Sequence, residues 1–249
     1  MAELDKQAAR SYGMGASRAG LSAIDEGLRA YMMQVYNYMA IGLAVTGIVA
    51  FGAFSMAFSG GQLTGFGQAI YMSPLKWVII FAPLAMVFLL SARLNSMSLG
   101  GAQMAFWAFA ALMGLSLSSI FLVYTGTSIA RVFFITAASF GALSLYGYTT
   151  KKDLSGWGSF LFMGLIGIII ASVVNIFLAS SALQFAVSVI GVLVFAGLTA
   201  YDTQQIKEMY SANDDGTLSG RKAIMGALRL YLDFINLFMM LLSLFGNRQ

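Results

Sequence analysis

The chain has 249 residues, of which 59% are hydrophobic and only 10% are charged. A soluble domain carries about 25% charged residues, so these proportions exclude a water-soluble globular protein and indicate a membrane protein. The sequence contains neither cysteine nor histidine, which excludes disulfides, thiolate nucleophiles, serine–histidine–aspartate triads and histidine-ligated metal sites. The net charge of +4 is small, and membrane topology explains its placement at the ends of apolar runs better than nucleic-acid binding does.

Residues 1–32 are predicted to form a polar cytoplasmic tail whose second half is an amphipathic helix. Apolar residues recur there at three- and four-residue spacing from Leu21 to Val35, and Ser22 is a candidate N-cap. We interpret this helix as an interfacial lead into the first membrane span rather than as a segment that binds a partner.

Seven apolar runs follow, each long enough to cross a bilayer, which takes roughly 20 residues. They fall near residues 33–58, 75–97, 102–124, 129–150, 158–179, 183–207 and 223–245. The predicted fold class is therefore all-α: a polytopic membrane domain over residues 33–249 with about seven transmembrane helices. Small residues spaced by four, such as Gly114 with Ser118 and Ala137 with Gly141, suit close packing between these helices.

The distribution of Lys and Arg predicts the orientation of the spans. With seven spans, one side of the membrane receives ten basic residues, and the other receives only Lys76, Arg131 and Arg248, while Arg229 falls within the last run. Cytoplasmic segments carry the excess of Lys and Arg. We therefore expect the N-terminus in the cytoplasm and the C-terminus outside.

Four charged residues interrupt the apolar runs: Arg93, Asp202, Arg229 and Asp233. A charge at the centre of a span costs about 2.5–3.5 kcal/mol on insertion scales, so such residues usually face protein or water and have a partner. At 1.5 Å per residue, the two aspartates and Arg93 can lie at a similar depth if the last helix enters the bilayer at Arg229. If that helix enters at residue 223 instead, Asp233 lies near mid-membrane and does not meet Asp202.

Periodicity places further polar residues beside these charges. The last helix carries four polar residues on one stripe of an otherwise apolar surface, at offsets of 0, 4, 7 and 14: Arg229, Asp233, Asn236 and Ser243. On the helix before it, Thr199, Asp202 and Gln205 are spaced by three and share a face. We expect the stripe to face other helices rather than lipid.

Two interpretations of these polar residues stay open. In the structural one, Asp233 pairs with Arg229 or Arg93, and Asp202 is a solvated carboxylate at a helix end. In the functional one, Asp202 and Asp233 face each other and gate or line an ion path. Two close carboxylates do not both ionise cheaply and tend to share a proton. Ionisable residues inside a membrane are functional candidates by default.

The connection before the last helix resembles a calcium loop only in part. Asn213, Asp215 and Gly216 occupy the third, fifth and sixth positions of such a loop. Lys222 stands at the twelfth position, where a calcium loop needs a bidentate glutamate. We therefore expect a solvated turn there and no metal site.

Three segments resemble the Bax inhibitor (transmembrane BAX inhibitor motif) family, especially its bacterial members. They are the Gly-Leu-Thr-Ala-Tyr-Asp-Thr-Gln-Gln-Ile-Lys segment at 197–207, the Leu-Tyr-Leu-Asp-Phe-Ile-Asn-Leu-Phe segment at 230–238, and the loop Thr-Lys-Lys-Asp-Leu-Ser at 150–155. The resemblance covers about residues 33–249. It implies a seven-helix protein of the bacterial inner membrane, with the last helix central and wrapped by the other six.

The resemblance also implies a function and a set of residues for it. It implies that a buried aspartyl pair, Asp202 and Asp233, senses pH and controls a calcium leak, and that Arg93 pairs with one aspartate as a latch. The leading hypothesis is therefore a pH-sensitive cation (calcium) leak channel. Arg229, Asn236 and Thr199 are expected to support the pair, and we expect neither enzymatic activity nor a cofactor.

Two alternatives remain beside the channel. The first is a non-conducting membrane scaffold that modulates a membrane protease or a response to stress or cell death, which the resemblance also implies. The second is an intramembrane protease, which is disfavoured because neither aspartate segment resembles an aspartyl-protease signature. The expected partners are a calcium ion as cargo, the lipid bilayer and a possible membrane protease, and nucleic acid is not among them.

Overall fold

The computed structural model of the protein describes the backbone of residues 2–248 and the side chains of residues 26–94 and 96–248. Within this part of the chain, seven helices are long and apolar enough to cross a membrane. They are α1 (Ala2–Ala57), α3 (Leu75–Arg93), α4 (Leu99–Leu117), α5 (Gly126–Thr149), α6 (Ser155–Leu178), α7 (Ser181–Glu208) and α8 (Gly216–Phe245). Each coincides with one predicted apolar run, so the all-α polytopic membrane fold is confirmed.

Local polar residues mark where several of these helices begin. Four helices follow a residue whose side chain accepts a hydrogen bond from a backbone N–H in the first turn: Ser98 before α4, Thr125 before α5, Ser180 before α7 and Asp215 before α8. Such a cap replaces a hydrogen-bond partner that the first turn of a helix lacks. The apolar runs thus become helices with defined starting points.

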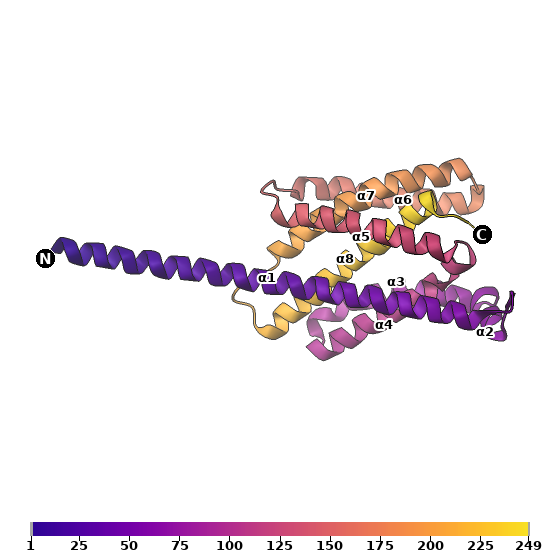
Figure 1. Cartoon of the computed structure of the whole chain (residues 1–249), viewed down its shortest axis with the longest axis horizontal. Helices are drawn as coiled ribbons and strands as arrows, with labels where there is room; N and C mark the ends of the chain where they lie inside the picture. The colour runs from indigo at the N-terminus through magenta and orange to yellow at the C-terminus, as the bar shows by residue number, and fades with distance from the viewer. Residues whose placement is uncertain (1, 249) are drawn as a thin grey trace.

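Helix α1 is continuous over 56 residues and includes the predicted tail, residues 1–32, from Ala2 onward (Figure 1). The prediction of an N-cap at Ser22 is wrong, because the helix runs through this residue. The part of α1 that is apolar enough to cross a membrane begins at Glu26. The tail and the first span are therefore one helix and not two elements.

The apolar face predicted for the amphipathic segment is used inside the protein. The side chain of Leu21 lies outside the described part of the chain. Tyr31 and Val35 are buried, at 3% and 0% exposure, and belong to the main hydrophobic core. The C-terminal half of the predicted interfacial helix therefore packs against protein and does not lie on the membrane surface.

A short hairpin follows α1, in the connection between the first two predicted apolar runs. Strand β1 (Phe58–Ser59) pairs antiparallel with β2 (Gln62–Leu63), and the two residues between them, Gly60 and Gly61, have φ angles of +59° and +80°. Glycine adopts positive φ at no steric cost, and two such residues make a turn that fits the twist of the strands. Four short helical segments complete the connections: α2 (Gly65–Gly67), a π-helical turn at Gln68–Met72, and 3-10 helices at Leu94–Ser96 and Ser118–Leu122.

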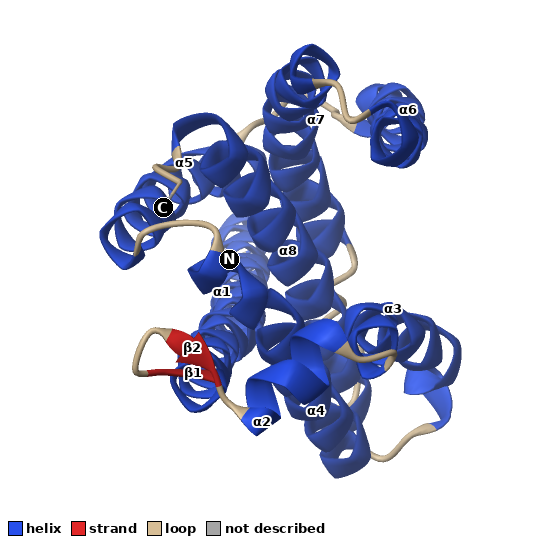
Figure 2. Ribbon diagram, turned by 90° about the vertical axis from the view of Figure 1, so that its right-hand side faces the viewer, coloured by secondary structure: helices blue, strands red, loops and turns tan. Residues whose placement is uncertain are grey.

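Helix α8 lies at the centre of the bundle (Figures 1 and 2). It packs against α7, α1, α5 and α4, and a larger share of its span is buried than of any other span. Helix α3 packs chiefly on α4 and helix α6 on α7, and these two pairs lie on opposite sides of α8 (Figure 2). The last helix is therefore central as expected, although α3 and α6 stand outside the ring that surrounds it.

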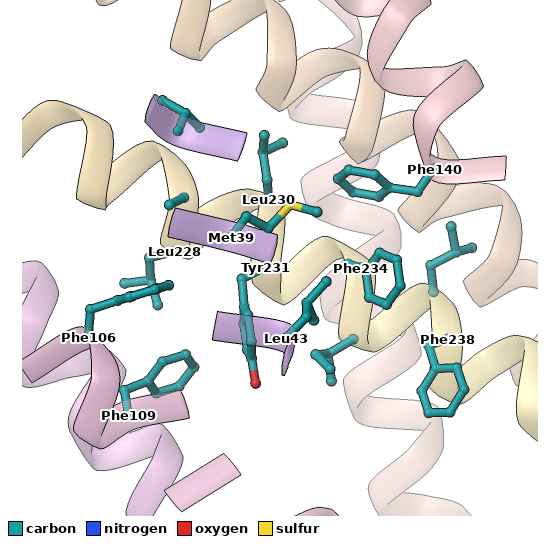
Figure 3. Close-up of a cluster of buried hydrophobic side chains, with 14 of the residues drawn as sticks. Met39, Leu43, Phe106, Phe109, Phe140, Leu228, Leu230, Tyr231, Phe234 and Phe238 are labelled. Carbon is teal, nitrogen blue, oxygen red and sulfur yellow. The ribbon is translucent and has the colours of Figure 1, made fainter. Parts of the chain in front are cut away.

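The core around α8 contains many aromatic side chains among aliphatic ones (Figure 3). Tyr231 is fully buried, with its ring centroid 6.3 Å from that of Phe106 and 5.2 Å from that of Phe109. Its hydroxyl shares a 2.6 Å hydrogen bond with the hydroxyl of Thr46 in α1. A buried tyrosine needs such a partner for its hydroxyl, and this one fixes the register of α8 against α1 and α4.

Glycine permits the closest approach at two helix crossings. A Cβ atom on Gly114 of α4 would lie 2.6 Å from the carbonyl oxygen of Thr46, and one on Gly147 of α5 would overlap the backbone of Ala200 in α7. Close packing at Gly114 is therefore confirmed. The prediction of close packing is wrong for Gly141, beside which there is open space.

Candidate functional site

A cavity of about 660 Å³ lies between α6, α7 and α8. Its polar lining comes from all three helices: Ser155 and Ser159 of α6, Tyr201 and Asp202 of α7, and Arg229, Asp233 and Asn236 of α8. The remaining lining residues are apolar or glycine. The cavity therefore gathers three of the four charged residues that interrupt the apolar runs. We call it the acidic cavity, after its two aspartates.

The acidic cavity brings Asp202 and Asp233 together. Asp202 is half-buried on α7, whereas Asp233 is only 5% exposed on α8. Their carboxyl groups lie side by side, close enough to interact directly. The sequence left two depths open for Asp233. The structure has the depth at which Asp233 meets Asp202.

One oxygen of this pair lacks a hydrogen bond. Asp233 Oδ2 is fully buried and has no partner among the described residues. A buried polar atom without a partner costs roughly 1–3 kcal/mol, and more if it is charged. Such atoms are rare in folded proteins, and each one calls for a specific reason. The carboxyl group of Asp233 is therefore unfavourable for the stability of the fold at this buried position.

Arg229 and not Arg93 is the cation beside the two carboxyl groups. Arg229 lines the acidic cavity, and its charge acts on both Asp202 and Asp233. Arg93 is exposed at the end of α3 and does not line this cavity. The physical reason is the packing of α3 on α4, which puts helix α3 across α8 from α7 (Figure 2). The structure therefore does not support the predicted latch at Arg93.

This placement predicts different effects for the two arginines. Arg229→Gln should lower the free energy of unfolding by about 1 kcal/mol, because it removes a charge partner of a buried carboxyl while its own exposed head is screened by solvent. Arg93→Gln should change it by less than about 0.5 kcal/mol. Thermal unfolding of the purified protein in detergent measures both. A larger loss for Arg93→Gln would restore Arg93 as the latch.

The residues expected to support the pair divide into two groups. Asn236 lines the acidic cavity one turn beyond Asp233. Thr199 is fully buried, does not line the cavity, and donates its hydroxyl hydrogen bond to the carbonyl oxygen of Phe195 at 2.8 Å. Threonine within a helix commonly makes this bond to its own backbone. Thr199 therefore makes no side-chain contact in the acidic cavity, and its supporting role stays a prediction.

Tyr201 is a cavity residue that the polar spacing did not single out. It lines the acidic cavity next to Asp202, and its ring lies against Gly158 of α6, where a Cβ atom would be 2.7 Å from the ring. The signal in the sequence was the Tyr-Asp dipeptide of the segment 197–207. Glycine at 158 is what lets α6 come close to this ring.

The connection before α8 is a capped turn. The Asp215 carboxylate accepts a 2.6 Å hydrogen bond from the backbone N–H of Leu218, and Lys222 forms a 2.6 Å ion pair with Asp214. Within the described part of the chain, no group of three acidic side chains could hold a metal ion. The predicted turn is confirmed.

The loop between α5 and α6 is attached to the end of α7. The side-chain amide of Gln204 accepts a 2.8 Å hydrogen bond from the N–H of Leu154 and donates a 2.8 Å bond to the carbonyl oxygen of Lys152. The amine of Lys207 donates a 2.8 Å bond to the carbonyl oxygen of Tyr148. Two of the three segments that carry the family resemblance therefore contact each other.

Known proteins match this chain over almost its whole length. Residues 28–249 match the family described as inhibitor of apoptosis-promoting Bax1. The chain is 52% identical to the inner membrane protein YbhL of Escherichia coli K12 over 225 residues, which cover 90% of this chain and 94% of that protein. It is 50% identical to RP147 of Rickettsia prowazekii over 227 residues, which cover 90% and 92%. It is also 46% identical over 243 residues to a protein of Caulobacter vibrioides, with 94% of each covered.

Proposed function

From the premise that the chain belongs to the Bax inhibitor family, we propose that it is a pH-sensitive cation channel that leaks calcium across the membrane. One observation carries the proposal: the side chain of Asp233, buried within the membrane-crossing bundle, lies beside that of Asp202 in the wall of a cavity. Calcium prefers carboxylate and other oxygen ligands. In this proposal calcium is the cargo, and the protein catalyses no reaction.

The aspartyl pair can exist in states that differ by one charge. With one proton between them, the two carboxyl groups can share a hydrogen bond. Without that proton they repel each other, and the repulsion is strong where water is scarce. The gain or loss of one proton therefore changes both the attraction between α7 and α8 and the attraction of the cavity for a cation.

The rest of the acidic cavity supports this role for the pair. Histidine, the side chain that ordinarily titrates between pH 5 and 8, is absent from the sequence. The polar residues that α6 contributes to the cavity are serines, and the other charged lining residue is Arg229. A response of the cavity to pH in this range therefore depends on Asp202 and Asp233 acting together.

The test is calcium flux through the purified protein in liposomes across a series of pH values. We expect flux above that of protein-free liposomes, with a steep change between about pH 5 and 8. If no calcium passes at any pH, the channel proposal fails. The alternative, a non-conducting scaffold that modulates a membrane protease or a stress response, then takes its place, and co-purification of a membrane protease would support it.

We also propose that the N-terminus lies in the cytoplasm and the C-terminus outside, on the basis of the excess of Lys and Arg. Seven spans and this asymmetry predict that a reporter active only outside the cytoplasm works when fused after Arg248. The same reporter inserted between Lys151 and Lys152, in the loop between α5 and α6, should be inactive. An inactive C-terminal fusion together with an active insertion between Lys151 and Lys152 would contradict the proposed orientation.

A further inference from the structure

A second cavity lies along the same three helices, toward their other end. Its volume is about 330 Å³. Its lining carries uncharged polar side chains from α6, α7 and α8: Ser172, Asn175, Gln184, Ser188 and Ser243. Two of these are hydrogen-bonded across helices, since Ser188 donates to the hydroxyl oxygen of Ser243 at 3.0 Å. We call it the polar cavity.

The two cavities occupy different depths of the same seam between α6, α7 and α8. At 1.5 Å per residue, Ser188 precedes Asp202 by about 21 Å along α7. Asn236, which lines the acidic cavity, precedes Ser243 by about 10 Å along α8. From Gln184 to Asp202 along α7, the two cavities and the segment between them extend over about 27 Å, which is close to the thickness of a hydrocarbon core, about 30 Å. The polar stripe predicted on α8 thus lines both of them.

A small apolar cluster adjoins both cavities: Val187 and Met240 also line the polar cavity, and Leu165 and Leu198 of the acidic cavity pack against the cluster. It consists of Ile168 of α6 with Val187 and Val194 of α7, all buried, and it is separate from the main core. Met240 of α8 packs against it. Met240 also fills the notch at Gly191, where a Cβ atom would lie 2.7 Å from its sulfur. We call these four side chains, Ile168, Val187, Val194 and Met240, the apolar plug.

The apolar plug interrupts the polar stripe of α8 at one position. The stripe runs from Arg229 through Asp233 and Asn236 to Ser243, and Met240 occupies the turn that lacks a polar residue. Methionine has three rotatable side-chain bonds and adapts to changes in the space around it. The plug can therefore change its shape with little movement of the backbone.

We propose that the apolar plug is the gate of the calcium path, and that the path runs along the α6–α7–α8 seam from the acidic cavity to the polar cavity. This inference rests on the proposed channel function. A hydrophobic constriction blocks ions when it is dry and passes them when it is wet. The hydroxyl and amide oxygens of the polar cavity can replace part of the hydration shell of a cation on the far side of the plug.

Another large cavity lacks these properties. A cavity of about 580 Å³ lies between α1 and α5. Among the described side chains, Arg29 is the one charged residue of its lining, none of the others carries a carboxyl group, and most are apolar. Such walls offer a calcium ion no oxygen ligands comparable to those of Asp202 and Asp233. The seam therefore offers the better route.

The first experiment adds one hydroxyl to the plug. Val194→Thr keeps the shape of the side chain but favours water at the constriction. We expect calcium flux to rise roughly tenfold at the pH where the wild type conducts least, which corresponds to a barrier lower by about 1.4 kcal/mol. The matched control is Val189→Thr on the same helix, where the side chain is 38% exposed and outside the plug. Equal flux in Val194→Thr and the control would overturn the gate.

The second experiment locates the path without relying on the gate. Because the chain has no cysteine, single cysteines can be introduced directly. A membrane-impermeant cationic thiol reagent added on the side of the polar cavity should modify Ser243→Cys and cut calcium flux at least tenfold. The control is Ser181→Cys, exposed at the same end of α7 and outside the polar cavity, which should be modified without a change in flux.

The outcomes separate this inference from the function on which it rests. If the wild type conducts and modification of Ser243→Cys leaves the flux unchanged, calcium takes another route and the inference is wrong while the channel remains. The closed plug also predicts that the reagent does not reach Asn236→Cys from that side at the least conductive pH. Rapid modification there would show that the plug does not seal the seam. If the wild type passes no calcium, the channel itself is refuted.

Discussion

Asp233→Asn is expected to remove the pH dependence of calcium flux, leaving rates in liposomes that differ by less than about twofold between pH 5 and 8. Asparagine keeps the shape of the side chain and part of its hydrogen bonding but cannot gain or lose a proton in this range. Asp202→Asn should have the same effect, because the sharing of a proton requires both carboxyl groups. Flux measured over a pH series with a calcium-sensitive dye inside the liposomes tests both variants.

The matched control for these variants is Asp153→Asn. Asp153 is fully exposed in the loop between α5 and α6, and the backbone N–H of Ser155 donates a 2.8 Å hydrogen bond to it. This bond holds the pKa of Asp153 below its usual range, so the carboxyl is ionised throughout the series. Its removal should leave the pH midpoint unchanged. An Asp202→Asn or Asp233→Asn variant that keeps the wild-type midpoint would take that residue out of the sensor.

Gly147→Ala is expected to be among the most destabilising single-methyl additions in the protein. The added Cβ would overlap the backbone of Ala200, and a backbone cannot give way as a side chain can. Helices α5 and α7 must therefore separate, at a cost near the upper end of the range for overpacking, about 3 kcal/mol. Thermal unfolding in detergent should show a clear fall in Tm.

The control lies in the same helix. Gly141→Ala adds the same methyl group where there is open space, and alanine favours a helix over glycine by roughly 0.5–1 kcal/mol. Its Tm should stay constant or rise slightly. Similar Tm values for Gly141→Ala and Gly147→Ala would mean that α5 and α7 do not approach as closely as described.

Apolar run length was sufficient to predict the seven spans, because each crossing needs about the same number of apolar residues. Run length does not say which helices are neighbours. Arg93 is at the expected end of α3, but α3 packs on α4 and so lies away from α7. The arginine that reaches the aspartates, Arg229, was visible on the same stripe as Asp233. The spacing of Arg229 and Asp233 follows from the geometry of one helix. A contact of Arg93 with an aspartate would depend on how two helices pack, which the sequence does not show.

The sequence could not decide the depth of the aspartyl pair or the exact face of α7. The depth of Asp233 relative to Asp202 depends on how α8 sits beside α7, which the length of neither run determines. Spacing by three drifts around a helix that has 3.6 residues per turn. Thr199 therefore lies beside the face that lines the acidic cavity and not on it, while Phe195, Leu198 and Asp202 lie on it.

The attachment of the α5–α6 loop to Gln204 limits which parts of the protein can move. Gln204 follows Asp202 on α7, and its two hydrogen bonds tie the end of this helix to the backbone between α5 and α6. A rotation of α7 about its own axis by about 100°, the angle between successive residues of a helix, would break both bonds. At this end of the bundle, we therefore expect α7 to move together with the loop between α5 and α6. A change in the spacing of the α7 and α8 backbones at Asp202 and Asp233 is then expected to come from a movement of α8 relative to α7.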